Sequence, residues 1–200
     1  TDKHIALAEY ESLGGTTGAI EQAVKKIVPS KLPPETEQAL RLSFVRHLVQ
    51  VNEKDEFVRR PAHWSDLPVA AQPLIEDFVK ARLLQISDDD EAATVEVSHE
   101  AIFRCWDQLK AWLHAELNNL RLRRKLEVTA KEWNGSVTTE RPNGDEDLCF
   151  TLGQLEAIDD WKQQVKLADI EQHFLKASRN KRNSDTQREI ERLQQLADAE

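Results

Sequence analysis

One histidine of this chain, His99, stands where a side chain could bind a phosphate group. It directly follows Thr94–Ser98, where β-branched and polar residues alternate as in a half-buried strand. Ser98 is a favourable helix N-cap, and apolar residues then recur at helical spacing as far as Leu113. We therefore expect His99 in the first turn of a helix, where unpaired N–H groups and the helix dipole favour an anion and an imidazole can donate a further hydrogen bond. From position alone, an ordinary first-turn or core histidine is the alternative.

The glycine-rich stretch Gly14–Gly18 lacks the residues that a phosphate-binding loop needs. Such a loop reads G-x-x-x-x-G-K-[ST], and no Gly-Lys pair occurs in the chain. We expect these glycines to form a hinge before a helix. The chain also has no Gly-x-Ser-x-Gly, no His-Glu-x-x-His and no cysteine beside a plausible base. The sequence therefore predicts no catalytic residues and no enzyme activity for this chain.

The charged clusters favour surface roles. The acidic run Asp88–Glu91 lacks the pattern of a calcium loop, and Cys105 and Cys149 are too few and too far apart for a disulfide framework or a zinc site, so we expect no metal. We expect two basic clusters on solvated helices: Arg121, Arg123, Arg124 and Lys125, with salt bridges to Glu116 and Glu127, and Lys176, Arg179, Lys181 and Arg182. For the first cluster, a contact to another domain or to a nucleotide phosphate is the alternative.

The elements that would position His99 form a mainly α plan with a small β-hairpin. Apolar periodicity and Pro/Gly signals predict a short strand at Phe57–Arg60 and three helices, at Ala19–Val28, from Pro33-Pro34 to Leu48, and at Pro68–Leu83. The strands Leu83–Ser87 and Thr94–Val97 would pair as a hairpin with the acidic run at its tip. Three helices followed by a hairpin are the plan of a winged helix.

The rest of the chain is expected to be helical. Leu120–Trp133 and Leu152–Val165 are predicted helices, separated by a loop over Asn134–Asp147. From Leu167 the apolar pattern thins, and it is too short to predict a coiled coil. Four tryptophans at helical spacing are expected in the core: Trp106, Trp112, Trp133 and Trp161.

Composition limits the classes of function. The chain has 200 residues, 40% of them hydrophobic, and a net charge of −9, which argues against general binding to nucleic acid or anionic membranes. It has no apolar run of spanning length and no signal peptide, and its few cysteines suit a reducing cytoplasm. Because it opens at Thr1 and contains no Met, we expect a piece of a longer protein.

The stretch VEVSHEAIFRCWDQLKAWL resembles the end of the winged-helix domain of bacterial STAND NTPases, especially those whose ATPase module precedes WD40 or similar repeats. The resemblance begins upstream at YESLGGTTGAI (Tyr10–Ile20). It continues through LRLRRKLEVTAKEW (Leu120–Trp133), LGQLEAIDDW (Leu152–Trp161) and IEQHFLKASRNKR (Ile170–Arg182). These segments cover most of the chain in the family's order.

The resemblance implies a regulatory part of a signalling ATPase. It implies a lead-in at residues 1–17, a winged helix at 18–115, a helical extension at 116–166 and a linker helix at 167–200. His99 would contact the β-phosphate of ADP and hold the inactive state, with Glu100 where the family's best-known motif has Asp. ADP or ATP with Mg²⁺ would bind the parent protein, not this chain alone. The implied partners are an upstream ATPase core, a downstream repeat or sensor domain and, on activation, further copies of the protein.

Two other functions remain open from the residues. A DNA-binding winged helix would need a basic recognition helix, but Pro68–Leu83 offers Lys80 and Arg82 against Glu76 and Asp77. A plain protein-interaction domain is the other alternative. A nucleotide titration and a DNA mobility-shift assay would separate the three.

Overall fold

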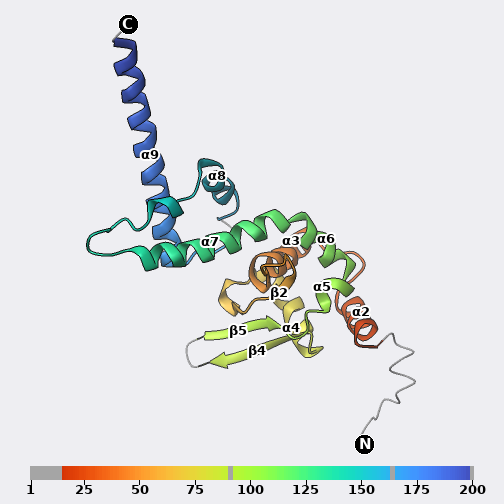
Figure 1. Cartoon of the computed structure of the whole chain (residues 1–200). Helices are drawn as coiled ribbons and strands as arrows, with labels where there is room; N and C mark the ends of the chain where they lie inside the picture. The colour runs from red at the N-terminus through yellow and green to blue at the C-terminus, as the bar shows by residue number, and fades with distance from the viewer. Residues whose placement is uncertain (1–14, 90–91, 163–164, 199–200) are drawn as a thin grey trace, which may run out of the picture. The chain divides into compact units, whose positions relative to one another are not determined.

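The chain folds into two compact units, which are divided after Leu120 (Figure 1). The computed structural model describes residues 15–89, 92–162 and 165–198. Helices make up most of these residues, and the strands form two small antiparallel sheets. The expected mainly α fold with a small β-hairpin is therefore confirmed. Within the described residues, no helix is both long and apolar enough to cross a membrane.

The first unit is built from short helices. Pro34 occupies the first position of α3 (Pro34–Leu42), where its missing N–H costs no hydrogen bond, and the chain continues into a π-helical turn, η1 (Ser43–Leu48). The other α-helices of the unit are α2 (Gly15–Ile27), α4 (Gln72–Lys80), α5 (Ile102–Cys105) and α6 (Asp107–Ala115). Two 3-10 turns, η2 (Trp64–Asp66) and η3 (Val69–Ala71), lead into α4.

Two small sheets join these helices. In the first, β1 (Val49–Val51) pairs antiparallel with β2 (Phe57–Arg59). In the second, the strand order is β3 (Ala62–His63), β5 (Ala92–Val97), β4 (Leu84–Asp89). The expected hairpin is present as β4–β5, with Leu84 opposite Val97. Because β1 and β3 have only three and two residues, they show no alternation that the sequence could reveal.

Aromatic side chains form the centre of the first unit's core. Phe44, Phe78 and Trp106 surround one another, with ring centroids 5.3–5.6 Å apart. Trp106 has an extended backbone, with φ −99° and ψ 98°, and separates α5 from α6. The single helix expected after Ser98 is therefore two helices, because Trp106 leaves helical geometry while its ring packs in the core.

The second unit packs around one face of α7 (Leu117–Ser136). A 3-10 turn, η4 (Glu146–Leu148), leads to α8 (Leu152–Trp161), which begins with a capping box between Thr151 and Gln154. The long helix α9 (Asp169–Asp198) packs its first turns against α8 and leaves residues 186–198 exposed. The core of the unit contains Leu126, Ala130, Trp133, Phe150, Leu155, Ile158, Trp161, Phe174 and Leu175.

Several predicted boundaries were wrong. Helix α2 begins at Gly15 rather than Ala19, so Gly15 and Gly18 are helical instead of forming a hinge; Gly14 lies outside the described residues. Helix α8 ends at Trp161, four residues before the predicted end. The prediction for the tryptophans is confirmed, because Trp106, Trp133 and Trp161 are buried and Trp112 packs against the core.

Candidate functional site

His99 lies in an exposed turn between two buried segments. Val97, at the end of β5, is fully buried, and Ile102, at the start of α5, is almost fully buried. Between them, Ser98 is half-buried and both His99 and Glu100 are exposed. The two apolar anchors hold the ends of the turn, so the backbone presents His99 to solvent from a fixed position.

Hydrogen bonds hold the same turn on both sides. The Ser98 N–H donates to the Leu83 carbonyl oxygen at 3.0 Å, which extends the β4–β5 ladder by one bond. The Arg59 N–H, at the end of β2, donates to Glu100 Oε1 at 3.1 Å. Glu100 therefore joins the turn to a strand 41 residues earlier in the chain.

The predicted helix start at this site is wrong. Helix α5 begins at Ile102 with Ala101 as its N-cap, so Ser98 is not a cap and His99 precedes the helix. The carbonyls of His99 and Glu100 accept the N–H groups of Ile102 and Phe103 at 3.1 Å each. Because α5 has only four residues, it has little dipole to attract an anion. What remains of the predicted phosphate site is the imidazole itself.

The His99 side chain is exposed to solvent. Within the described part of the chain, its side chain makes no hydrogen bond and no ion pair, and Glu100 beside it is occupied by the Arg59 N–H. A second carboxylate nearby, Glu96 on β5, accepts from Gln85 and lies 3.7 Å from Arg59 Nη1. An exposed imidazole can donate one hydrogen bond to a phosphate oxygen, and more strongly when it is protonated.

The first basic cluster is not a wholly solvated face. The side chain of Arg123 is only 12% exposed and forms ion pairs with Glu127, at 2.9 Å, and with the buried Glu171, at 3.3 Å. The predicted pair with Glu127 is therefore confirmed, but the expectation that Arg123 is solvated is wrong. Its guanidinium also lies 5.8 Å from the centre of the Trp161 ring. Arg123 thus holds α7 and α9 together inside the second unit.

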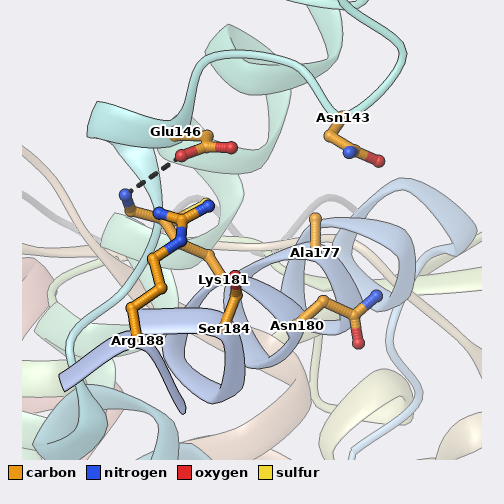
Figure 2. A pocket seen from close by; sticks show the side chains of 8 residues that line it. Asn143, Glu146, Ala177, Asn180, Lys181, Ser184 and Arg188 are labelled. Carbon is orange, nitrogen blue, oxygen red and sulfur yellow. Dashed lines mark hydrogen bonds and ion pairs between the residues drawn. The ribbon is translucent and has the colours of Figure 1, made fainter. Parts of the chain in front are cut away.

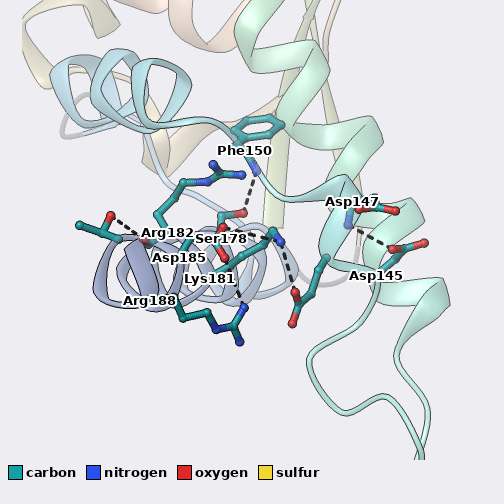
Figure 3. A network of polar contacts seen from close by, with 10 residues as sticks. Asp145, Asp147, Phe150, Ser178, Lys181, Arg182, Asp185 and Arg188 are labelled. Atoms are coloured by element: carbon teal, nitrogen blue, oxygen red, sulfur yellow. Dashed lines mark hydrogen bonds and ion pairs between the residues drawn. The ribbon is translucent and has the colours of Figure 1, made fainter. Parts of the chain in front are cut away.

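A pocket of about 290 Å³ lies between α9 and the 143–149 segment (Figure 2). Its charged groups are occupied within the unit: Lys181 lies 3.2 Å from Glu146 and 3.7 Å from Asp185, and Arg188 lies 3.6 Å from Asp185. Behind it, the Phe150 N–H donates to the buried Ser178 Oγ at 3.1 Å (Figure 3). The residues around this pocket therefore attach α9 to the 143–150 segment of the same unit.

The part of the chain that the structure describes contains no group of three His, Cys, Asp or Glu side chains that could hold a metal ion. Cys105 and Cys149 are both free thiols. Asp90 and Glu91, half of the acidic run, lie outside the described residues.

The first unit is mainly helical, with a small hairpin that is followed directly by the exposed His99. The family model of novel STAND NTPase 1 matches residues 1–141. The chain therefore belongs to the novel STAND NTPase 1 family, as the resemblance predicted. The match covers the whole first unit, including His99, and all of α7. No curated protein and no solved structure shows a significant match to the chain.

Proposed function

We propose that this chain is the regulatory part of a STAND NTPase and that His99 senses the bound nucleotide. One observation supports the proposal most: the histidine that the family resemblance singles out is an exposed, unbonded side chain on a turn held at both ends. A sensor needs a free donor in a fixed place, because ordering a mobile side chain on binding would cost part of the binding free energy.

In this proposal the first unit is a winged helix with the β4–β5 hairpin as its wing. ADP, held by an ATPase core upstream, would accept a hydrogen bond from His99 through its β-phosphate. Exchange for ATP with Mg²⁺ would release the winged helix, and α9 would pass the change to a downstream sensor domain. A ligand can drive such a switch only through different affinities for the two states, and His99 would supply part of that difference.

Substitution of His99 in the full-length protein tests the proposal. We expect His99→Ala to weaken ADP binding about 10- to 150-fold, because a lost hydrogen bond to a charged group costs about 1.5–3 kcal/mol. Binding of ATP with Mg²⁺ should change much less, since the winged helix would contact nucleotide only in the closed state. Isothermal titration with each nucleotide measures both.

His173→Ala is the matched control, because His173 is another exposed histidine, on α9, without a hydrogen bond to any described residue. It should leave both affinities unchanged. Equal ADP affinity in the wild type and a folded His99→Ala variant would show that His99 is an ordinary surface residue.

A further inference from the structure

A second concave surface of the chain has an unusual charge. A groove of about 680 Å³ lies in the second unit, between the end of α8 and the first turns of α9. Among the described residues that line it, four are cationic and none is acidic: Lys162, Lys166, Lys176 and Arg179, together with Leu167, Gln172 and Leu175. The chain as a whole has a net charge of −9, so this local concentration of positive charge is opposite in sign to the net charge.

Internal ion pairs account for only half of these cations. Asp159 on α8 contacts Lys162 and lies 2.7 Å from Arg179. The hydrogen bond from Lys162 lowers the pKa of Asp159, burial raises it, and the charge of Arg179 lowers it further, with a net decrease, so Asp159 stays ionised at neutral pH. Lys166 and Lys176 are exposed and form no ion pair with any described residue. Their charges therefore face the groove uncompensated.

The groove also has an apolar part. Leu167 is half-buried and lines the groove, whereas Leu175 is almost fully buried and belongs to the core of the unit. The segment that carries Leu167 is held in place, because Gln172 Nε2 donates to the Leu167 carbonyl oxygen at 2.9 Å and Glu171 accepts the Ala168 N–H at 2.8 Å. An apolar side chain among cations fits a ligand that is both acidic and partly apolar.

The cations of the pocket in Figure 2 differ from those of this groove. There, Lys181 and Arg188 are each paired with an acidic side chain of the same unit. Surface charges of both signs are usually interspersed, so two lysines without ion pairs in one groove leave a local positive field. The contrast indicates a surface whose positive charges are balanced by an acidic ligand.

We infer that this groove binds an acidic peptide segment of a partner protein, with an apolar side chain seated on Leu167 and its carboxylates on Lys166 and Lys176. The volume lies within the range of about 300–1,000 Å³ that is usual for ligand sites. A bare phosphate would leave Leu167 uncovered, whereas a purely apolar segment would leave the lysines without counter-charges. The site lies in the second unit and does not depend on His99.

Fluorescence polarisation with the 200-residue chain tests this. The probe is a fluorescein-labelled 12-residue peptide of alternating Asp and Glu with Leu at its fifth and ninth positions. We expect saturable binding that weakens as salt rises from about 50 to 300 mM, because screening acts on exposed charges. A peptide with Lys in place of the acids should not bind, and one with Ser in place of Leu should bind at least five-fold more weakly.

Charge reversal locates the site. The double variant Lys166→Glu/Lys176→Glu should lose at least tenfold in affinity, while Lys110→Glu/Lys131→Glu should stay within twofold. Lys110 on α6 and Lys131 on α7 are exposed lysines outside the groove, so both variants change the net charge equally. Circular dichroism and thermal unfolding verify that both variants are folded.

Three results would overturn the inference. The first is no saturable binding of the acidic peptide below 1 mM. The second is an equal loss of affinity in the two double variants, which would show a net-charge effect. The third is displacement of the peptide by 1 mM inorganic pyrophosphate together with unchanged binding of the Ser-containing peptide, which would assign the groove to a phosphate-bearing ligand.

Discussion

Glu116, the C-cap residue of α6, links two segments of the first unit through its charge. Its carboxylate lies 2.8 Å from Arg41 Nη2 and 2.9 Å from Arg46 Nη2, and the side chain is only 14% exposed. Burial raises the pKa of Glu116, but a hydrogen bond from Asn119 and the charges of Arg46 and Arg41 outweigh it and hold the pKa below its ordinary value. Glu116 therefore stays charged at neutral pH and stabilises the fold.

Glu116→Gln should lower the free energy of unfolding by about 1.5–3 kcal/mol at pH 7, because it removes the carboxylate charge that pairs with both Arg41 and Arg46. Since the pKa of Glu116 is lower in the folded state, its stabilisation is complete above the unfolded-state pKa and is lost as pH falls through the folded-state pKa. The difference between wild type and variant should therefore shrink below about pH 4. Urea unfolding at pH 7 and pH 3.5 measures it. A difference that grows at low pH would contradict this account.

At the scale of elements, the loop after α7 is fastened to the helix by Trp133. The indole Nε1–H donates to the Asn143 carbonyl oxygen at 2.8 Å, and the ring packs against Phe174. Gly144, next along the loop, has φ +63°, a conformation that other residues rarely adopt. A Cβ on Gly144 would lie 2.5–2.8 Å from Trp133 ring atoms. The close approach of loop and indole therefore requires glycine here.

Gly144→Ala should destabilise the second unit by about 1–3 kcal/mol, through the positive φ and the overlap with the indole. Tryptophan fluorescence and urea unfolding should both respond. Gly135→Ala is the matched control, because a Cβ at Gly135 meets nothing within 4 Å and the residue lies in α7. It should be neutral or stabilise by up to about 1 kcal/mol. Equal stability of the two variants would show that the loop moves away from Trp133 at no cost.

At the scale of the whole chain, the net charge of −9 opposes DNA binding. Within α4, the helix that a DNA-binding winged helix would use for recognition, Lys80 already pairs with Asp77 at 2.8 Å. We expect binding to duplex DNA weaker than the 100 μM end of the usual non-specific range at physiological salt. A mobility-shift assay with random and mixed-sequence duplexes tests this. A salt-dependent shift at micromolar protein would favour the DNA-binding alternative.

Local patterns in the sequence determined much of this fold. The β4–β5 hairpin and the helices α3, α4, α7 and α8 follow from periodicity and from Pro and capping signals, because these act between residues a few positions apart. The burial of three tryptophans also follows, since large apolar side chains at helical spacing must cover one another. The family assignment likewise came from the order of short motifs along the chain.

Only the tertiary structure decided which polar side chains form hydrogen bonds or ion pairs within the protein. The bond from Arg59 to Glu100 spans 41 residues, and the pair of Arg123 with Glu171 joins two helices, so neither leaves a local pattern. The break at Trp106 arises because packing its ring beside Phe44 outweighs one turn of helix. The uncompensated charges of Lys166 and Lys176 emerged in the same way, because a salt bridge depends on distance in space and the sequence records only distance along the chain.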